Sequence, residues 1–314
     1  FVFIVLTVVI MNIFMIALLA YTLQTSRERK EAEVRTNVEN LTLLLEKSIS
    51  ISSREIDLSL HTLQAYVEKE LRDKKQLDNN EINNLIQRQQ DWISYVARIN
   101  ITDEKGQVQF GQSDIDRRLN YAKYSVFKDA QQHNENQLFV TKLMRDPNGQ
   151  GWVNLFVRRY NQPDGTFAGV ITATLPASYF NNLITKLNVG SKGVVLVQDL
   201  DMRIIARNPM LETLNGQVGF VGGPPELSRL VQSGIHSGTI YTRRTTDKVP
   251  RIGTFRRLTG MPAFVVVAFA EQDYLAQWYN DVTKAVLLEF IFLLVTTIAA
   301  GLLWRQIQAS FFAN

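Results

Sequence analysis

Two long apolar runs, one at each end of the chain, restrict its fold more than any other feature. The first run, residues 1–23, is FVFIVLTVVIMNIFMIALLAYTL and carries no charge; the second, residues 285–304, contains a single acid, Glu289. About 20 apolar residues at ~1.5 Å per residue cross a hydrocarbon core of ~30 Å. We therefore expect transmembrane helices at 1–23 and 285–304, with membrane lipid around both.

The alternative for the first run is a cleaved signal peptide, whose apolar region is shorter and ends at a small-residue cleavage site. Here the segment TLQTS, residues 22–26, leads directly into a charged helical pattern, so we favour an uncleaved anchor. Trp304 and Arg305 end the second run in the way that an interfacial aromatic residue and a cytoplasmic cation do. This orientation places residues 24–284 outside the cytoplasm. It makes residues 305–314 the start of a cytoplasmic region that we expect to continue beyond this sequence.

The composition argues against several classes of function. Cysteine is absent, which removes disulfides and thiolate chemistry, and the three histidines, His61, His133 and His236, lack metal-motif spacing. The net charge is +4 with bases and acids interleaved, so no nucleic-acid patch is expected. No GxSxG, HExxH or P-loop occurs, and the glycine-rich GFVGGPP at 219–225 is expected to be an ordinary loop. We expect no enzyme activity, cofactor or metal in this part of the protein.

Residues 24–72 are expected to form one long helix. They contain no Pro or Gly, and apolar residues recur at helical spacing at Val34, Val38, Leu41, Leu45, Ile56, Leu60, Leu63, Val67 and Leu71. At ~1.5 Å per residue the rod is roughly 70 Å long and continues the first membrane helix. We expect it both to pack on its own domain and to serve as a signalling lever and dimer interface.

The segment 73–188 is expected to be a first α/β module. A helix is predicted at 81–93, and after it the pattern changes to alternating strands and turns, with strong turns at DPNG (146–149) and QPDG (162–165). The expected strands form an antiparallel sheet of about five members, at 95–102, 107–110, 138–144, 152–160 and 168–175. A helix at 177–187 then leads out of this module.

The segment 189–284 repeats the same kind of module. The strands are expected at 193–198, 203–206, 238–243, 251–258 and 263–270, with a short helix at 226–232. Residues 271–283 return to helix and continue into the second membrane run. The predicted fold class is α+β: a long N-terminal helix and two tandem modules with antiparallel sheets, flanked by two transmembrane helices.

Several segments resemble the double Cache (dCache) sensor domains of bacterial transmembrane receptors. The run RRYNQPDGTFAGV, residues 158–170, resembles the "RR…DG.F.GV" hairpin of that family, and PASYF at 176–180 resembles the helix start that follows it. GVVLV at 193–197, IIARNP at 204–209 and GMPAFVV at 260–266 resemble elements of its second module. The resemblance implies two PAS-like modules beside a long helix, usually paired in a homodimer. It also implies a bacterial inner membrane, with residues 24–284 periplasmic or extracellular.

In function, the resemblance implies that a small ligand binds in the membrane-distal module, 73–188, and that the signal crosses the membrane to a cytoplasmic output domain. The hairpin variant looks most like those attached to diguanylate cyclases. The alternatives are the sensor of a histidine kinase or chemoreceptor, and a ligand-independent module for dimerisation or protein interaction. The aromatic and Arg motif of the amino-acid-binding branch does not align here, which argues against an amino-acid or amine ligand.

The alternation along 152–160 suggests a ligand site. It places Trp152, Asn154, Phe156, Arg158 and Tyr160 on one face and leaves an apolar core face opposite. An Arg fork beside an aromatic wall suits a carboxylate or phosphate. The expected ligand contacts are therefore Arg158, Trp152, Asn154, Tyr121, Tyr124, Phe127, Arg118 and Asp114. In the alternative, Arg158 pairs with an acid and Trp152 packs in the core. A second, weaker candidate site in the other module comprises Arg207, Tyr241 and Arg256.

Overall fold

The computed structural model describes residues 2–73, 77–111, 113, 116–133, 136–149, 151–211, 216–243 and 247–312. The chain divides into two compact units, Phe1–Asn37 with Ala270–Asn314, and Val38–Phe269. Helix α1 (Val2–Asp73) contributes to both units, and each unit is described by itself.

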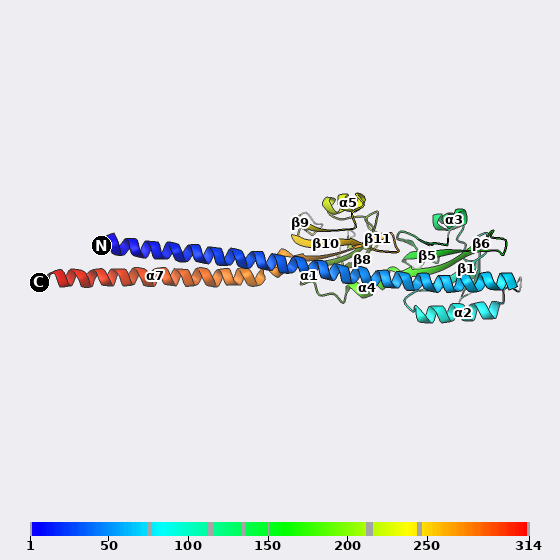
Figure 1. The fold of residues 1–314 in the computed structure, drawn as a ribbon, viewed down its shortest axis with the longest axis horizontal. Helices are drawn as coiled ribbons and strands as arrows, with labels where there is room; N and C mark the ends of the chain where they lie inside the picture. The colour runs from blue at the N-terminus through cyan, green and yellow to red at the C-terminus, as the bar shows by residue number, and fades with distance from the viewer. Residues whose placement is uncertain are drawn as a thin grey trace. The chain divides into compact units, whose positions relative to one another are not determined.

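The first unit contains the start of α1, the short helix α6 (Glu271–Tyr274) and the helix α7 (Ala276–Phe312) (Figure 1). The apolar windows of α1 and α7 have mean hydropathies of 3.0 and 2.5, and only 6% and 0% of them are buried. Both helices are thus long and apolar enough to cross a membrane, and their large apolar side chains point outward, as in Phe3 and Leu288, which are 80% and 67% exposed.

Polar contacts join α1 and α7 within this unit. The Asn12 side-chain amide donates to Thr296 Oγ1 at 3.2 Å inside the apolar stretch. Where the apolar stretch ends, Trp278 Nε1 donates to the Leu23 carbonyl at 2.9 Å. Arg27 lies over the Trp278 ring at 5.6 Å. The two helices therefore lie side by side at both levels, and the aromatic residue marks the boundary where such residues gather in membrane proteins.

The second unit begins with the rest of α1, which lies along two sheets (Figure 1). Its inward face is a continuous apolar stripe, buried at Val38, Leu45, Ile49, Ile56, Leu60, Leu63 and Val67. Hydrogen bonds fix this face to the sheets: Thr42 Oγ1 donates to the Thr254 carbonyl at 3.4 Å, and Ser53 Oγ donates to the Gly260 carbonyl at 3.1 Å. The helical spacing seen in the sequence is therefore the spacing of core contacts.

The distal sheet is antiparallel, in the order β2-β1-β6-β5-β3, and β4 also pairs with β5. Its strands are β1 (Arg98–Thr102), β2 (Val108–Phe110), β3 (Leu138–Val140), β4 (Met144–Arg145), β5 (Trp152–Asn161) and β6 (Phe167–Pro176). Helices α1 and α2 (Asn79–Trp92) lie on one side; the 3-10 turn η1 (Asp116–Arg118) and α3 (Ser125–Gln132) lie on the other. Helix α2 starts after Asp78, whose carboxylate accepts from the amides of Asn80 and Glu81.

The proximal sheet is also antiparallel, in the order β8-β7-β11-β10-β9. Its strands are β7 (Val194–Asp199), β8 (Ile204–Asn208), β9 (Ser237–Thr242), β10 (Arg251–Arg257) and β11 (Ala263–Ala270). Helix α4 (Ala177–Ile184) connects the two modules, and α5 (Pro225–Gln232) packs on the apolar face of this sheet through Leu227 and Val231.

The α+β fold with a long helix and two antiparallel sheets is confirmed. Three details differ from the sequence analysis. The expected strand 138–144 is divided into β3 and β4 at Thr141. The Thr141 carbonyl accepts from the Asn154 side-chain amide, and Thr141 Oγ1 accepts from the Leu155 backbone amide, while the Thr141 amide donates to the Leu155 carbonyl. The helix expected at 271–283 is interrupted at Leu275, and α3 forms where no helix was expected.

Candidate functional site

An open cleft lies in the distal module between α3 and the β3–β4 segment, with a volume of about 890 Å³. This is in the range of small-molecule pockets. Its lining mixes apolar or aromatic residues with charged ones; the apolar or aromatic residues include Tyr124, Val126, Phe139, Leu143 and Met144, and the charged residues are Lys123, Asp129, Lys142, Arg145 and Asp146. The cleft therefore has the mixed lining that such pockets use.

Asp146 connects this cleft to a buried ion pair. The tight turn after β4 holds this residue, since the Gly149 amide donates to its carbonyl at 2.8 Å and the Asn148 amide donates to its carboxylate at 2.9 Å. Arg98, the first residue of β1, donates from Nη1 and Nη2 to the two carboxylate oxygens at 3.1 and 2.5 Å. Only 4% of the Asp146 side chain and 11% of the Arg98 side chain are exposed.

A second carboxylate completes the cluster. Asp116 of η1 is buried, and its Oδ1 lies 3.3 Å from Nε of Arg98, while its Oδ2 accepts from Ser113 Oγ at 2.7 Å. Burial lowers the pKa of Arg98, but the hydrogen bond and charge of Asp146 outweigh burial and leave the pKa raised. One guanidinium faces two carboxylates, so the group Arg98, Asp116 and Asp146, here named the acidic cluster, has a formal charge of −1.

Two buried oxygens beside the acidic cluster, Asn100 Oδ1 and Thr172 Oγ1, lack a hydrogen-bond donor among the described residues, and Asp116 Oδ1 has only its ion pair with Arg98. Asn100 and Thr172 are directly opposite each other on β1 and β6, and Arg98 is opposite Thr174. These polar residues therefore alternate on one face of the sheet. Because buried polar groups almost always find partners, this face has unused capacity to accept hydrogen bonds from a bound molecule or water.

The site residues predicted from the loop before β3 lie on this same side of the sheet. Tyr121 is buried, and its hydroxyl accepts from the Asn100 amide at 3.2 Å. Tyr124 lines the cleft, and Phe127 is buried in the apolar cluster with Leu155. Arg118 is exposed at the end of η1. Asp114 lies outside the described residues.

The residues predicted from β5 lie elsewhere. Arg158 faces α1, where it donates to Asp57 Oδ1 at 2.6 Å, to Gln64 Oε1 at 3.4 Å and to Asn136 Oδ1 at 2.5 Å. Asn154 donates to the Thr141 carbonyl at 2.9 Å. The arrangement of Arg158 matches the alternative in which it pairs with an acid. The alternation along β5 is as expected, but Arg158 and Tyr121 lie on opposite faces of the sheet.

Trp152, at the start of β5, contacts the proximal module. The guanidinium of Arg145 lies 4.2 Å from its ring centroid. A Cβ built on Gly219 would fall 2.1 Å from Cζ2 of Trp152, so the ring lies directly against this glycine. Trp152 is therefore placed at the junction of the two modules.

The sequence analysis missed Arg98, Asn100, Asp116, Asp146 and Thr172. A signal was available in β1, where Arg98, Asn100 and Thr102 alternate with Ile99 and Ile101. Polar residues at every second position of a buried strand indicate a polar interior face. From the sequence, Asp146 was interpreted only as the first residue of the DPNG turn at 146–149. Among the described residues, no group of three or more Asp, Glu or His side chains is arranged to hold a metal ion.

No protein-family model and no curated protein matches this sequence. Among solved structures, the extracellular domain of rpHK1S-Z16, assigned as a histidine kinase, aligns with a TM-score of 0.67 at 20% identity, covering 77% of this chain and 96% of that one. The periplasmic sensory domain of the Campylobacter jejuni chemoreceptor Tlp1 aligns at 0.64 and 13% identity, covering 78% and 98%. The ligand-binding domain of Mlp24 with asparagine aligns at 0.57 and 13%, covering 80% and 98%.

These three solved structures are an extracellular domain, a periplasmic sensory domain and a ligand-binding domain. The fold of this chain is therefore similar to the fold of these three domains.

Proposed function

We propose that this chain is the extracytoplasmic sensor of a transmembrane receptor, and that it binds a small ligand in the distal cleft. The observation that carries the proposal is Asp146, which lines the cleft and belongs to the acidic cluster, together with the nearby buried oxygens of Asn100 and Thr172, which have no donor among the described residues. The similarity to extracellular ligand-binding domains supports a sensory role. The domain boundaries of the sequence analysis, with the distal module at 73–188 and the proximal module at 189–284, are part of this proposal.

The chemistry of the cluster favours a ligand that donates hydrogen bonds and carries positive charge. A buried group of charge −1 is stabilised by a cation, and an ammonium supplies three donors. Mlp24 is solved with asparagine and Campylobacter jejuni Tlp3 with isoleucine, both of which contain an amino group. We therefore favour an amine or amino acid here over a ligand recognised only through a carboxylate on Arg158. Lys123, at the edge of the cleft, is available to a ligand carboxylate.

The output is proposed to be a diguanylate cyclase, encoded beyond residue 314 and reached through the second membrane helix. Only the resemblance of the hairpin at 158–170 supports this choice, and a histidine kinase or chemoreceptor is the alternative. The codons that follow decide between them. Ligand shifts the receptor toward the signalling state only by its difference in affinity for the two states.

We also propose that the chain works as a homodimer in a bacterial inner membrane, with residues 24–284 outside the cytoplasm. Leu44, Ile51 and Leu58 recur at intervals of seven on α1 and are 64%, 57% and 55% exposed. Apolar residues at heptad spacing on a helix surface are typical of a helix–helix seam. A ligand-independent module remains the alternative function, and the experiment below separates the two.

The experiment is a thermal-shift screen of the chain in nanodiscs against amino acids and small amines. Binding to the folded state raises the melting temperature by mass action. Asp146→Asn should weaken a hit about 10- to 100-fold, because a charge-assisted hydrogen bond is lost. Asp91→Asn, which changes an exposed acid on α2, is the matched control.

Thr172→Val is the second variant. It removes a buried hydroxyl that has no partner among the described residues and keeps the shape of the side chain. It should therefore weaken ligand binding without lowering the melting temperature of the free protein. If no amine or amino acid shifts the melting temperature, or if both variants bind a hit as the parent chain does, the distal cleft is not the sensory site.

A further inference from the structure

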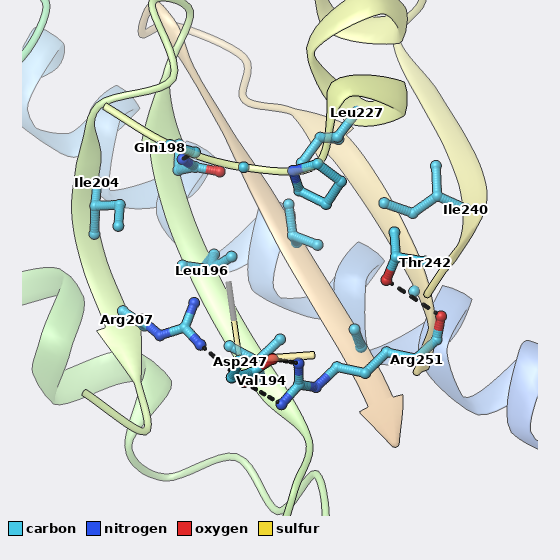
Figure 2. A pocket seen from close by; sticks show the side chains of 16 residues that line it. Val194, Leu196, Gln198, Ile204, Arg207, Leu227, Ile240, Thr242, Asp247 and Arg251 are labelled. Carbon is cyan, nitrogen blue, oxygen red and sulfur yellow. Dashed lines mark hydrogen bonds and ion pairs between the residues drawn. The ribbon is translucent and has the colours of Figure 1, made fainter. Parts of the chain in front are cut away.

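The proximal module contains a partly enclosed cavity between its sheet and the segment that leads into α5 (Figure 2). The walls are apolar and include Val194, Leu196, Ile204, Leu227, Ile240 and Val266. Its volume is about 50 Å³. One water occupies about 10–15 Å³ of such a cavity, so a molecule of a few heavy atoms fits inside.

The glycine-rich segment at 219–225 forms one wall of this cavity. Gly219 donates to the Ile204 carbonyl at 2.8 Å, and Gly222 donates to the Met202 carbonyl at 3.0 Å. These bonds hold the segment across β8. The sequence analysis expected only a loop here, and the structure gives that loop the role of closing an interior space.

One end of the cavity is positively charged. Asp247 accepts from Nη1 and Nη2 of Arg251 at 2.8 and 2.7 Å, and Nε of Arg251 donates to the Lys192 carbonyl at 2.8 Å. Arg207 is the third charged residue, and its Nη2 lies 3.6 Å from the same carboxylate. Two guanidiniums therefore share a single carboxylate, and the three side chains have a formal charge of +1.

The Arg207 guanidinium does not use all of its hydrogen-bond donors among the described residues. Its Nε donates to the Pro209 carbonyl at 3.1 Å, whereas its Nη1 has no hydrogen bond or ion pair to any described residue. The side chain is only 9% exposed. Burial lowers the pKa of Arg207, the direction expected when a cation lacks full compensation. In Figure 2 the guanidinium points into the space between β8 and Arg251.

Gln198 supplies a polar group at the other end of the cavity. It is fully buried, and its amide nitrogen donates to the carbonyls of Met202 at 3.0 Å and Gly222 at 2.6 Å. Its Oε1 is buried without a donor among the described residues and turns toward the cavity in Figure 2. Leu196, opposite Arg207 in the sheet, is two residues from Gln198. At ~3.3 Å per residue the two polar groups are about 7 Å apart along the strand.

We propose that this cavity is a second ligand site, for a small monocarboxylate of about three carbons. The carboxylate pairs with Arg207, the short chain lies between Ile204 and Val266, and the hydroxyl of a 2-hydroxy acid donates to Gln198. The site goes beyond the proposed function, because it lies in the other module and selects the opposite charge from the acidic cluster. Of the three residues predicted for a second site, only Arg207 lines it; Tyr241 is 45% exposed.

The test measures binding of propionate and L-lactate to the full chain in nanodiscs by ligand-observed NMR, with n-propanol and propylamine as uncharged and cationic comparisons. Both acids should bind saturably, lactate more tightly, and the comparison compounds should not bind. Arg207→Gln should weaken both acids about 10- to 100-fold, since a charge-assisted hydrogen bond is lost. Arg229→Gln, on the exposed face of α5 with 76% of its side chain exposed, should leave binding unchanged.

Two further variants keep the proposal open to refutation if Arg207→Gln folds poorly. Val266→Leu fills the cavity, leaves the charges in place, and should abolish binding. Asp146→Asn, in the distal cleft, should not change it. Absence of saturable binding, undiminished binding to Val266→Leu or to a folded Arg207→Gln, or loss of binding in Asp146→Asn would each overturn the proposal. The amine screen of the distal cleft does not depend on this result.

Discussion

Trp152 of the distal sheet lies against Gly219 of the proximal module, so close that a Cβ on Gly219 would fall 2.1 Å from Cζ2 of the indole ring. Gly219 precedes Gly222, Gly223 and Pro224, which line the proximal cavity, and the guanidinium of Arg145, next to Asp146, lies over the same ring, 4.2 Å from its centroid. Trp152 therefore lies between Arg145, which lines the distal cleft, and the segment that contributes Gly222 and Gly223 to the proximal cavity.

Gly219→Ala should loosen this junction. The added methyl group cannot fit unless the ring moves, and the backbone has a φ of +87°, which favours glycine. We expect the free energy of unfolding to fall by about 2–4 kcal/mol, from overpacking and backbone strain together. Gly234→Ala is the matched control: φ is +84° but nothing lies within 4 Å, so only the strain of about 1–2 kcal/mol applies. Chemical denaturation measures the free energy of unfolding of both variants. Equal decreases in the two variants would show that the Trp152 ring moves aside without an energetic cost.

Arg158→Ala distinguishes a structural from a ligand-binding role. The guanidinium is 8% exposed and holds Asp57, which is 32% exposed, on α1. Removing it leaves a partly exposed acid without its partner, at a cost of about 1–3 kcal/mol. We expect a lower melting temperature for the free protein but an unchanged shift with any ligand of the distal cleft. If the variant instead lost the ligand-induced increase in melting temperature while the melting temperature of the free protein stayed unchanged, Arg158 would be a ligand-binding residue.

The contrast between Arg158 and Arg98 shows why the fold was more predictable than the site. Periodicity along 152–160 places Arg158 and Val157 on opposite faces, but it does not tell which face α1 covers. That choice depends on the packing of Ile56, Leu60 and Leu63 against the sheet, a tertiary contact. Arg98, Asp116 and Asp146 belong to three separate segments, and only the pairing of β1 with β6 and the turn after β4 bring them together.

The pH dependence of stability should carry a contribution from Asp199. This carboxyl is fully buried at the turn between β7 and β8, and burial raises its pKa above the ordinary 3.8, although the amides of Arg203 and Asp201 donate to it. Between the ordinary pKa and the raised one, the folded state therefore binds more protons at this carboxyl than the unfolded state does. Stability from this group should fall as the pH rises from about 3.8 through the raised pKa, and level off above it.

Asp199→Asn isolates that contribution. The amide oxygen still accepts from the two backbone amides but does not titrate, so the difference in unfolding free energy between the two proteins should favour the parent chain progressively more toward acid pH. Denaturant titrations at a series of pH values measure this difference. A difference that is constant across the series, or that grows toward neutral pH in favour of the parent chain, would contradict the assignment.

The exposed heptad stripe on α1 makes a prediction about assembly. Leu44, Ile51 and Leu58 are each more than half exposed, while the opposite face of the helix is buried in its own module. A charge at Ile51, in the middle of the stripe, would be desolvated in a seam between two copies, which proteins avoid unless it is paired. Ile51→Glu should therefore convert a dimer of the full chain into monomers in light scattering at micromolar concentration. Met210→Glu places the same charge at an apolar residue of similar exposure, 56%, away from α1, and should leave the dimer intact. A dimer that survives Ile51→Glu would place the interface on another surface.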